Sequence, residues 1–420
     1  MRLFPFLGLA VVAVAPLVIA QAEDKRSLRL QEAIARILSA NPSLAAETQL
    51  VRAAQARRDV LALGHPLAGG LDLENFAGSG QHQGADALEA TLRLSGVIEL
   101  GNKRELRRQA GDGEVQLAEA RREAARLDLL ANAARRFLEV VADQERLVLA
   151  QRAATLAQRS AAIVEERTKA GAASGVDRNR AQLALAKIEI GREHAEHELA
   201  AARVALAVLW GVRQPDFDRA DANLYDLPAP QELAALEQRL EGNPDVVVLA
   251  SESRLQGARA TLAAASRRPD LGLSGGVRRL EQTDDQALIM TLSVPLFSDS
   301  RAEPARREAE STRDGTLKSL EARRLELQAT LFEVYQELLH ARTEVGVLRE
   351  RALPRAEENL ALLENGYRLG RYSYLELSTG QTQLLELQRE LLDAARDYHD
   401  FLIEIERLTA MPAAATGVSP

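Results

Sequence analysis

Apolar residues recur along this chain with two different periods, one typical of strands and one typical of helices. Between residues 88 and 100, apolar residues occupy almost every even position, and residues such as Arg93 occupy the odd positions. An alternation of period two places the apolar side chains on one face of a β-strand. A similar alternation recurs in three shorter segments: 71–74, 271–278 and 288–296.

Long stretches with little or no proline follow each pair of predicted strands. Residues 101–169 contain no proline, and the segment 305–369 contains only Pro354. Between 317 and 348, apolar residues follow one another mostly every three or four positions. A sustained period near 3.5 predicts helices that pack against neighbours in a left-handed supercoil. A helix of about 65–70 residues would be about 100 Å long at 1.5 Å per residue.

The two halves of the chain resemble each other at an offset of about 200 residues. The Asn-Pro pair at 41–42 recurs at 243–244, and the turn around Gly171 recurs around Gly370. Each half contains a helix, two strands, a long helix, a tight turn and a returning helix. We therefore expect a signal peptide (1–22), a first structural repeat (23–211), a linker (212–230), a second structural repeat (231–411) and a disordered C-terminal tail (412–420).

The N-terminus has the features of a secretory signal peptide. Arg2 precedes an almost wholly apolar run at 3–20, and Ala20-Gln21-Ala22 supplies a small-residue cleavage site. An uncleaved membrane anchor is the alternative, because the apolar run approaches the length of a membrane span.

Composition excludes several classes of function. The chain has no cysteine, so it forms no disulfide, no cysteine metal site and no thiol nucleophile. Its net charge of −8 gives no reason to expect nucleic-acid binding. There is no Ser-His-Asp order and no glycine-rich phosphate loop that leads into a helix. We therefore expect neither an enzyme nor a bound cofactor.

The predicted strands are too few to close on themselves. They have the length of strands that cross a membrane at a tilt, but open strand edges are costly in lipid. Three copies would supply about 12 strands, which is enough for a barrel. Leu94, Ile98 and Leu100 would then face lipid. Ser95 and Glu99 would face the lumen.

The fold class expected from these elements is mainly α with a small β part. Long α-helical hairpins would form a trimeric periplasmic α-barrel. The strands would form a transmembrane β-barrel with four strands per protomer.

Particular motifs resemble the outer membrane efflux (TolC) family over about residues 27–411. They are the duplicated half, "VPLF" at 294–297 and the turn "NGYRLGRYSYLEL" at 365–377. The resemblance implies a homotrimeric channel in outer membrane lipid that extends into the periplasm. It also implies two protein partners, a periplasmic adaptor (membrane fusion) protein and an inner-membrane RND pump.

Two motifs are similar to the cobalt-zinc-cadmium resistance (CzcC) branch of that family, whose members serve pumps that expel divalent metal cations. "ENFAGSG" at 74–80 and "IELGNKRE" at 98–105 carry this similarity. The alternatives are a multidrug or type I secretion channel of the same family, a periplasmic adaptor, and a soluble coiled-coil scaffold. The strand–helix junction residues of the second motif are Glu99, Gly101, Lys103 and Arg104.

The hairpin tips are predicted to form the periplasmic entrance. Asp177 and Glu376 occupy equivalent positions after the two turns. In a trimer each would form a threefold acidic ring that attracts cations. The alternative is that each acid only complements the positive end of its helix dipole.

The family resemblance also implies a lock at the entrance, in which a Tyr and an Arg near the second tip hold an Asp near the first. Tyr367 and Asp177 match two of these positions, and we expect a hydrogen bond between them. Tyr372 stands at the Arg position, so Arg371 or Arg368 is a candidate substitute.

A histidine pair provides a weak candidate for metal binding. His194 and His197 are three residues apart on a predicted helix, a spacing that can hold a metal ion. No third ligand follows from the spacing, and a solvated charged face is the alternative.

Overall fold

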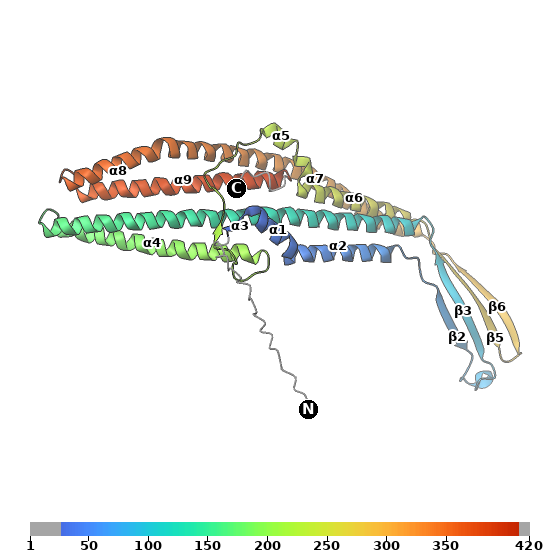
Figure 1. The fold of residues 1–420 in the computed structure, drawn as a ribbon. Helices are drawn as coiled ribbons and strands as arrows, with labels where there is room; N and C mark the ends of the chain where they lie inside the picture. Colours follow the sequence, from blue (N-terminus) through green and yellow to red (C-terminus); the bar gives the residue numbers. More distant parts are fainter. Residues whose placement is uncertain (1–26, 411–420) are drawn as a thin grey trace, which may run out of the picture.

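The protein is strongly elongated, with a four-stranded sheet at one end and two helical hairpin tips at the other (Figure 1). The computed structural model describes residues 27–410. The predicted signal peptide (1–22) and C-terminal tail (412–420) lie outside the described residues.

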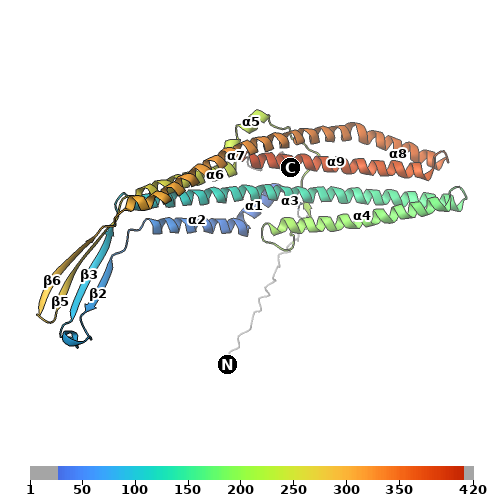
Figure 2. The same cartoon turned by 180° about the vertical axis from the view of Figure 1, so that it is seen from behind.

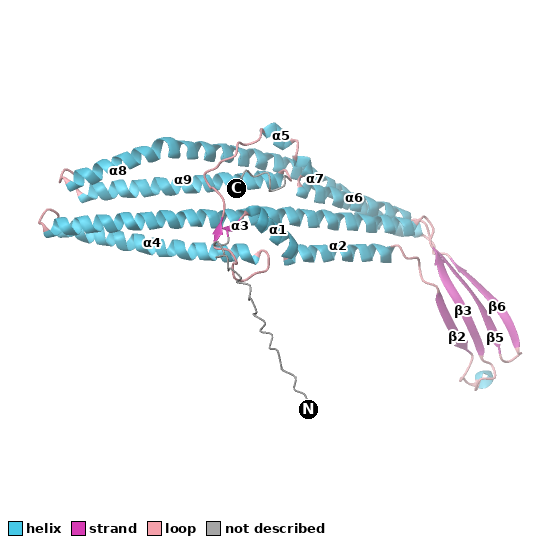
Figure 3. Ribbon diagram, in the orientation of Figure 1, coloured by secondary structure: helices cyan, strands magenta, loops and turns pink. Residues whose placement is uncertain are grey.

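Helices account for most of the described chain (Figure 3). The first half contains α1 (Leu30–Ala40), α2 (Pro42–Leu61), α3 (Lys103–Lys169) and α4 (Gly175–Val208). The second half contains α5 (Leu233–Glu237), α6 (Pro244–Ala265), α7 (Ser298–Val347), a π-helical turn (Leu348–Ala352), α8 (Leu353–Arg368) and α9 (Tyr374–Leu408). Short 3-10 turns lie at Gly80–His82 and Leu240–Gly242.

Helix α3 forms the spine of the molecule. Its 67 residues run without a break from the sheet to the first tip, as the absence of proline predicts. A helix of this length spans about 100 Å. It packs against α2 and α4 on one side and against α6 and α9 on the other.

The second long segment is interrupted before Pro354, as the sequence predicts. Proline has no N–H to donate to the carbonyl of Glu350, and the π-helical turn Leu348–Ala352 immediately precedes it. The helical segment starts earlier than the predicted residue 305. It begins at Ser298, because Phe297 takes a left-handed conformation that turns the chain directly out of the sheet.

The main sheet contains β2 (Ala68–Glu74), β3 (Glu89–Ile98), β5 (Leu271–Leu280) and β6 (Asp285–Ser293) in the order β2-β3-β5-β6. All neighbouring strands are antiparallel, and the pairing of β3 with β5 joins the two halves of the chain. The outer edges of β2 and β6 have no partner strand in the described chain.

The register aligns the apolar residues of the four strands on one face. Leu71 pairs with Leu92, Leu92 with Val277, and Val277 with Leu288. These side chains are exposed, up to 88% for Leu288. The apolar positions of the alternation therefore lie on one face of the main sheet, and this face is exposed in the described chain.

The opposite face of the sheet is polar and internally paired. Arg278 donates hydrogen bonds to Thr91 Oγ1 at 2.9 Å and to Glu89 Oε2 at 2.8 Å. Arg93 lies 3.3 Å from Asp72 on the same face. None of the helices within residues 27–410 is long and apolar enough to cross a membrane.

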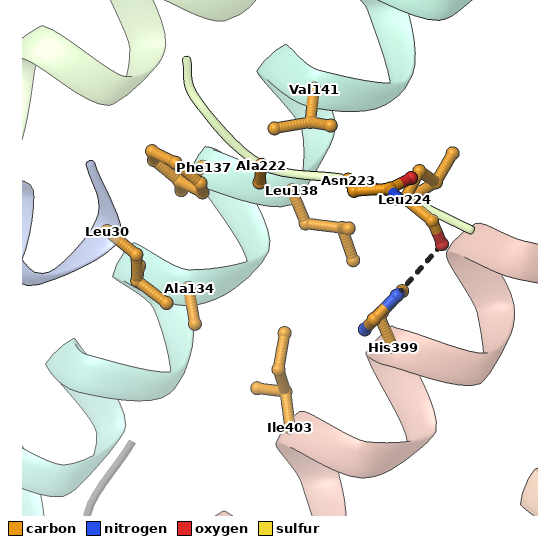
Figure 4. Close-up of a pocket in the computed structure, with 10 residues that line it drawn as sticks. All are labelled: Leu30, Ala134, Phe137, Leu138, Val141, Ala222, Asn223, Leu224, His399 and Ile403. Carbon is orange, nitrogen blue, oxygen red and sulfur yellow. Dashed lines mark hydrogen bonds between the residues drawn. The ribbon is translucent and has the colours of Figure 1, made fainter. Parts of the chain in front are cut away.

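The segment between the two halves is bound tightly to the middle of the helices. Strand β4 (Arg219–Ala220) pairs in parallel with β1 (Ser27–Leu28), and the side-chain amide of Gln144 bonds both backbone groups of Ala220. In an adjacent apolar pocket, buried His399 donates from Nε2 to the carbonyl of Leu224 at 3.0 Å (Figure 4). Burial lowers the pKa of His399, which favours its neutral form. The hydrogen bond from His399 therefore has a structural role, because it holds the linker segment against α9.

Candidate functional site: the strand–helix junction and the hairpin tips

The junction begins with two residues in the left-handed region. Gly101 has φ +84° and Asn102 has φ +57°. A Cβ on Gly101 would lie 2.9 Å from Cδ of Arg268 and 3.3 Å from the carbonyl oxygen of Ala265. The close approach and the positive φ explain why glycine occupies this position.

Lys103 ties the start of α3 to the second half of the chain. Its Nζ donates to the carbonyl of Arg268 at 2.7 Å and to Asp270 Oδ1 at 2.8 Å. Only 8% of the residue is exposed. The ammonium therefore joins the first turn of α3 to the segment between α6 and β5.

Glu99 and Arg104 join the same junction to the end of α2. Arg107 binds both oxygens of Glu99, at 2.5 and 2.9 Å, and His65 lies 3.2 Å away. The hydrogen bond from Arg107 lowers the pKa of Glu99, which favours its charged form. Arg104 Nε donates to the carbonyl of Ala62 at 2.6 Å.

The expected placement of Glu99 and Leu100 on a barrel strand is wrong. Strand β3 ends at Ile98, so both residues lie beyond its last paired position. The side chain of Glu99 is 9% exposed and is held by Arg107 instead of lining a lumen. The motif that resembles a family signature is thus a structural clamp.

Both hairpin tips have the same construction. Gly171 and Gly370 have φ of +72° and +74°, and each is followed by a capping box. Ser174 Oγ donates to Asp177 Oδ2 at 2.8 Å, and Ser373 Oγ donates to Glu376 Oε2 at 2.8 Å.

These capping boxes show the local role of the two acids. Each carboxylate accepts hydrogen bonds from the N-cap serine just before its helix, as the dipole interpretation of the sequence expects. Hydrogen bonds from Ser373 lower the pKa of Glu376, so it remains charged at neutral pH. Whether either acid faces a pore depends on neighbouring copies and stays a prediction.

The expected hydrogen bond between Tyr367 and Asp177 is not formed within the chain. The Tyr367 hydroxyl is buried and has no hydrogen-bond partner among the described residues. Asp177 is instead held by Ser174, three residues away. Burial is the main cause that raises the pKa of Tyr367, so its hydroxyl keeps its proton.

Arg167 is a tip residue that sequence reasoning missed. Its guanidinium donates to the carbonyl of Arg368 on the second tip at 2.9 Å and to the carbonyl of Ala172 on the first at 3.2 Å. It also lies 4.9 Å from the centre of the Tyr367 ring. The only available signal was a basic residue in the last turn of α3, which is common at helix C-termini.

Tyr372 does not reproduce the function of an arginine. Its ring covers Gly366, where an added Cβ would lie 2.1 Å from the ring Cδ2. The side chains of Arg368 and Arg371 form no ion pair within residues 27–410. The cross-tip contact is therefore made by Arg167 and not by these candidates.

The histidine pair has no third potential metal ligand within the described chain. His194 and His197 are exposed and interact with Glu198 at 3.1 Å and Glu193 at 3.8 Å, respectively. Residues 27–410 contain no cluster of three or more His, Cys, Asp or Glu side chains that could hold a metal ion.

Glu406 is a buried acid that gives the protein a pH-dependent stability. It is 5% exposed near Leu338, and burial raises its pKa from 4.5 to about 8. The unfolded chain loses this proton first, so stability falls as pH rises from 4.5 to about 8. We expect Glu406→Gln to raise stability by about 1–3 kcal/mol at pH 8 and above. Thermal unfolding between pH 5 and 9 checks this, and an equal gain at every pH would contradict it.

Comparison with known proteins supports a family assignment. A model of the outer membrane efflux protein family matches residues 33–212 and 235–410. The cobalt-zinc-cadmium resistance protein CzcC of Cupriavidus metallidurans is 29% identical over 325 residues, which cover 76% of each chain.

Solved structures share the fold. A structure of CusC has a TM-score of 0.78 and 17% identity, and the match covers 92% of both chains. The outer membrane protein VceC from Vibrio cholerae has a TM-score of 0.73 and 18% identity, with 91% of this chain and 95% of that chain covered.

These comparisons confirm the predicted fold class of long helical hairpins with a small sheet. They decide against the periplasmic adaptor and the isolated coiled coil that the sequence left open. The protein belongs to the outer membrane efflux protein family and is an efflux channel of the outer membrane, with helices that extend into the periplasm.

Proposed function

We propose that three copies of this chain form the outer-membrane component of a tripartite efflux system that exports divalent heavy-metal cations. The open sheet is the observation that carries the proposal. Its apolar face is exposed, and β2 and β6 have no further partner in the described chain. Such a sheet is stable in a bilayer only when other copies pair with both edges. Three copies at four strands each supply about 12 strands.

The length of the helices supports a connection to the inner membrane. Helix α3 spans about 100 Å, more than three times the thickness of a bilayer core. The far tips therefore lie deep in the periplasm, where a periplasmic adaptor and an inner-membrane RND pump can reach them. The channel acts passively in this scheme, and the pump supplies the energy.

The tips supply the entrance of the proposed tube. Asp177 and Glu376 cap their helices at equivalent positions of the two tips, so a trimer would carry two threefold rings of acidic residues. Such rings concentrate cations and repel anions. Tyr367, Tyr372 and Arg371 lie at the same end and belong to the proposed gate.

The cargo proposal rests on the relative named for cobalt, zinc and cadmium resistance. The motif at 98–105, which resembles this branch, lies within residues 33–212, the first segment that the family model matches. The alternative is a multidrug or type I secretion channel of the same family.

Deletion of the gene for this protein tests the cargo. We expect the deletion strain to tolerate several-fold less zinc, cobalt or cadmium, because the pump loses its exit through the outer membrane. Growth inhibition across a metal dilution series measures the effect, and the wild-type gene supplied in trans should restore tolerance. Unchanged metal tolerance together with new drug sensitivity would assign the channel to the multidrug alternative.

A further inference from the structure

Two acidic residues lie directly opposite each other at the free end of the main sheet. The chain enters β2 from α2 and leaves β3 into α3, so Glu74 and Glu89 lie at the end of the sheet far from the helices (Figure 2). The register pairs Glu74 with Glu89 across the two strands. In the proposed trimer the apolar face of the sheet meets lipid, so these side chains line the external mouth of the lumen. Like charges in directly opposed positions destabilise an antiparallel pair.

Arg278 of β5 lies between the two acids and removes this repulsion. Its Nη1 donates to Glu89 Oε2 at 2.8 Å, and its Nη2 donates to Glu74 Oε2 at 3.2 Å. Its Nε donates to Thr91 Oγ1 at 2.9 Å, which fixes the guanidinium against β3. The Glu74 side chain is 53% exposed, so an ion in the lumen can reach this position. The guanidinium therefore occupies the place in which two carboxylates would otherwise bind a divalent cation.

A second arginine on the same face makes a similar contact closer to the helices. Arg93 Nη1 lies 3.3 Å from Asp72 Oδ2. A Cβ on Gly70 would lie 3.2 Å from Nε of Arg93, so the glycine leaves room for this side chain over β2. Each carboxylate on the polar face of β2 and β3 thus has an arginine nitrogen within 3.3 Å.

The acidic residues at the hairpin tips have no such partners. Asp177 and Glu376 accept hydrogen bonds from serine hydroxyls, and neither forms an ion pair with a residue within 27–410. The two ends of the proposed tube therefore differ in their electrostatics. Acidic residues at the entrance lack basic partners, whereas those of β2 and β3 at the exit are paired with arginine.

From this contrast we propose that Arg278 is a built-in counter-ion that keeps divalent cations from being held at the external mouth. The role rests on the proposed export of divalent metal cations and adds a residue that determines how readily they leave. An ion pathway conducts only when each site binds weakly enough to release the ion. Because the guanidinium is attached to the neighbouring strand, its high local concentration lets it compete with a free cation for both carboxylates.

Removal of the guanidinium tests this role. Trimers of Arg278→Gln in planar bilayers should carry a potassium current that cobalt ions on the external side reduce several-fold more strongly than the wild-type current. The double variant Arg278→Gln/Glu89→Gln has the net charge of the wild type and only one acid at this position. Cobalt should therefore affect the double variant no more than the wild type. Cobalt that binds at the tips acts on all these channels alike.

Arg279→Gln is the matched control on the other face of the sheet. Arg279 also contacts two acids, at 3.1 Å from Glu281 and 2.6 Å from Asp284. It directly follows Arg278 in the strand, so its side chain points to the apolar face. The two acids that this variant leaves without their arginine lie outside the lumen. Cobalt should therefore reduce its current no more than it reduces the wild-type current.

The outcomes decide whether Arg278 has this role. Strong cobalt block of Arg278→Gln alone supports it. Equal block of Arg278→Gln and the wild type, or of Arg278→Gln and Arg279→Gln, overturns it. If Arg278→Gln forms no trimer on an unheated gel, Arg278→Lys should assemble and show intermediate block, because an ammonium lacks the fork that binds both carboxylates. If neither variant assembles, Arg278 serves the folding of the sheet and the proposed role is wrong. Unchanged metal tolerance of the deletion strain would overturn the proposed cargo, and the cobalt measurement is independent of that result.

Discussion

Replacing Arg167 with alanine should raise the conductance of the channel several-fold in planar bilayers. Arg167 donates hydrogen bonds to carbonyls of both tips and lies over the Tyr367 ring. Losing these contacts removes about 3 kcal/mol from the arrangement that joins the two tips, which shifts the ratio of joined to separated tips by roughly 100-fold. Arg167→Lys should restore little, because one ammonium cannot reproduce the planar fork that reaches both carbonyls.

Arg178 provides the matched control for this result. It is an exposed arginine in the first turn of α4, close to the same tip, and it forms no ion pair within residues 27–410. Arg178→Ala removes the same charge but should leave conductance unchanged. Equal increases in both variants would show that net charge at the tip, and not the Arg167 contacts, controls the current.

Replacing Lys103 with alanine should destabilise the protein by about 3 kcal/mol and lower its yield in the outer membrane. The variant leaves Asp270 and the Arg268 carbonyl without their donor at a largely buried position. Because Lys103 joins α3 to the segment before β5, the damage should extend to the pairing of the sheet. Thermal unfolding of the purified protein in detergent measures the loss.

Lys169 at the other end of α3 is the control for this variant. It is exposed and its ion pair with Glu165 spans 3.5 Å at the surface, so Lys169→Ala should change stability by less than about 0.5 kcal/mol. If Lys103→Ala lowers the thermal stability no more than Lys169→Ala does, the contacts of Lys103 do not stabilise the junction.

Periodic features of the chain could be predicted, because they depend on local rules. The alternation around Leu92 specified which side of the sheet is apolar, and the absence of proline specified the unbroken length of α3. The glycines at 171 and 370 marked the tips, since both have positive φ.

Contacts between distant segments could not be predicted in the same way. Glu99 continues the alternation in the sequence, but Arg107, one turn into the helix, binds its carboxylate and removes it from the sheet. Arg167 reaches the second tip 201 residues away, a contact that no local pattern encodes. The position of Asp177 was predicted, but within the chain its carboxylate accepts from Ser174 and not from the expected partner Tyr367.

The π-helical turn Leu348–Ala352 has a consequence for how the length of this chain can vary. A loop can gain or lose a residue and leave its neighbours in place, but a helix cannot. One residue removed here would rotate everything beyond it by about 100°. Leu362 would leave the exposed side of α8, and Tyr367 would leave the buried cluster at the tips. The number of residues between α7 and α8 therefore sets the orientation of α8, and an insertion or deletion there would rotate the residues of the proposed gate.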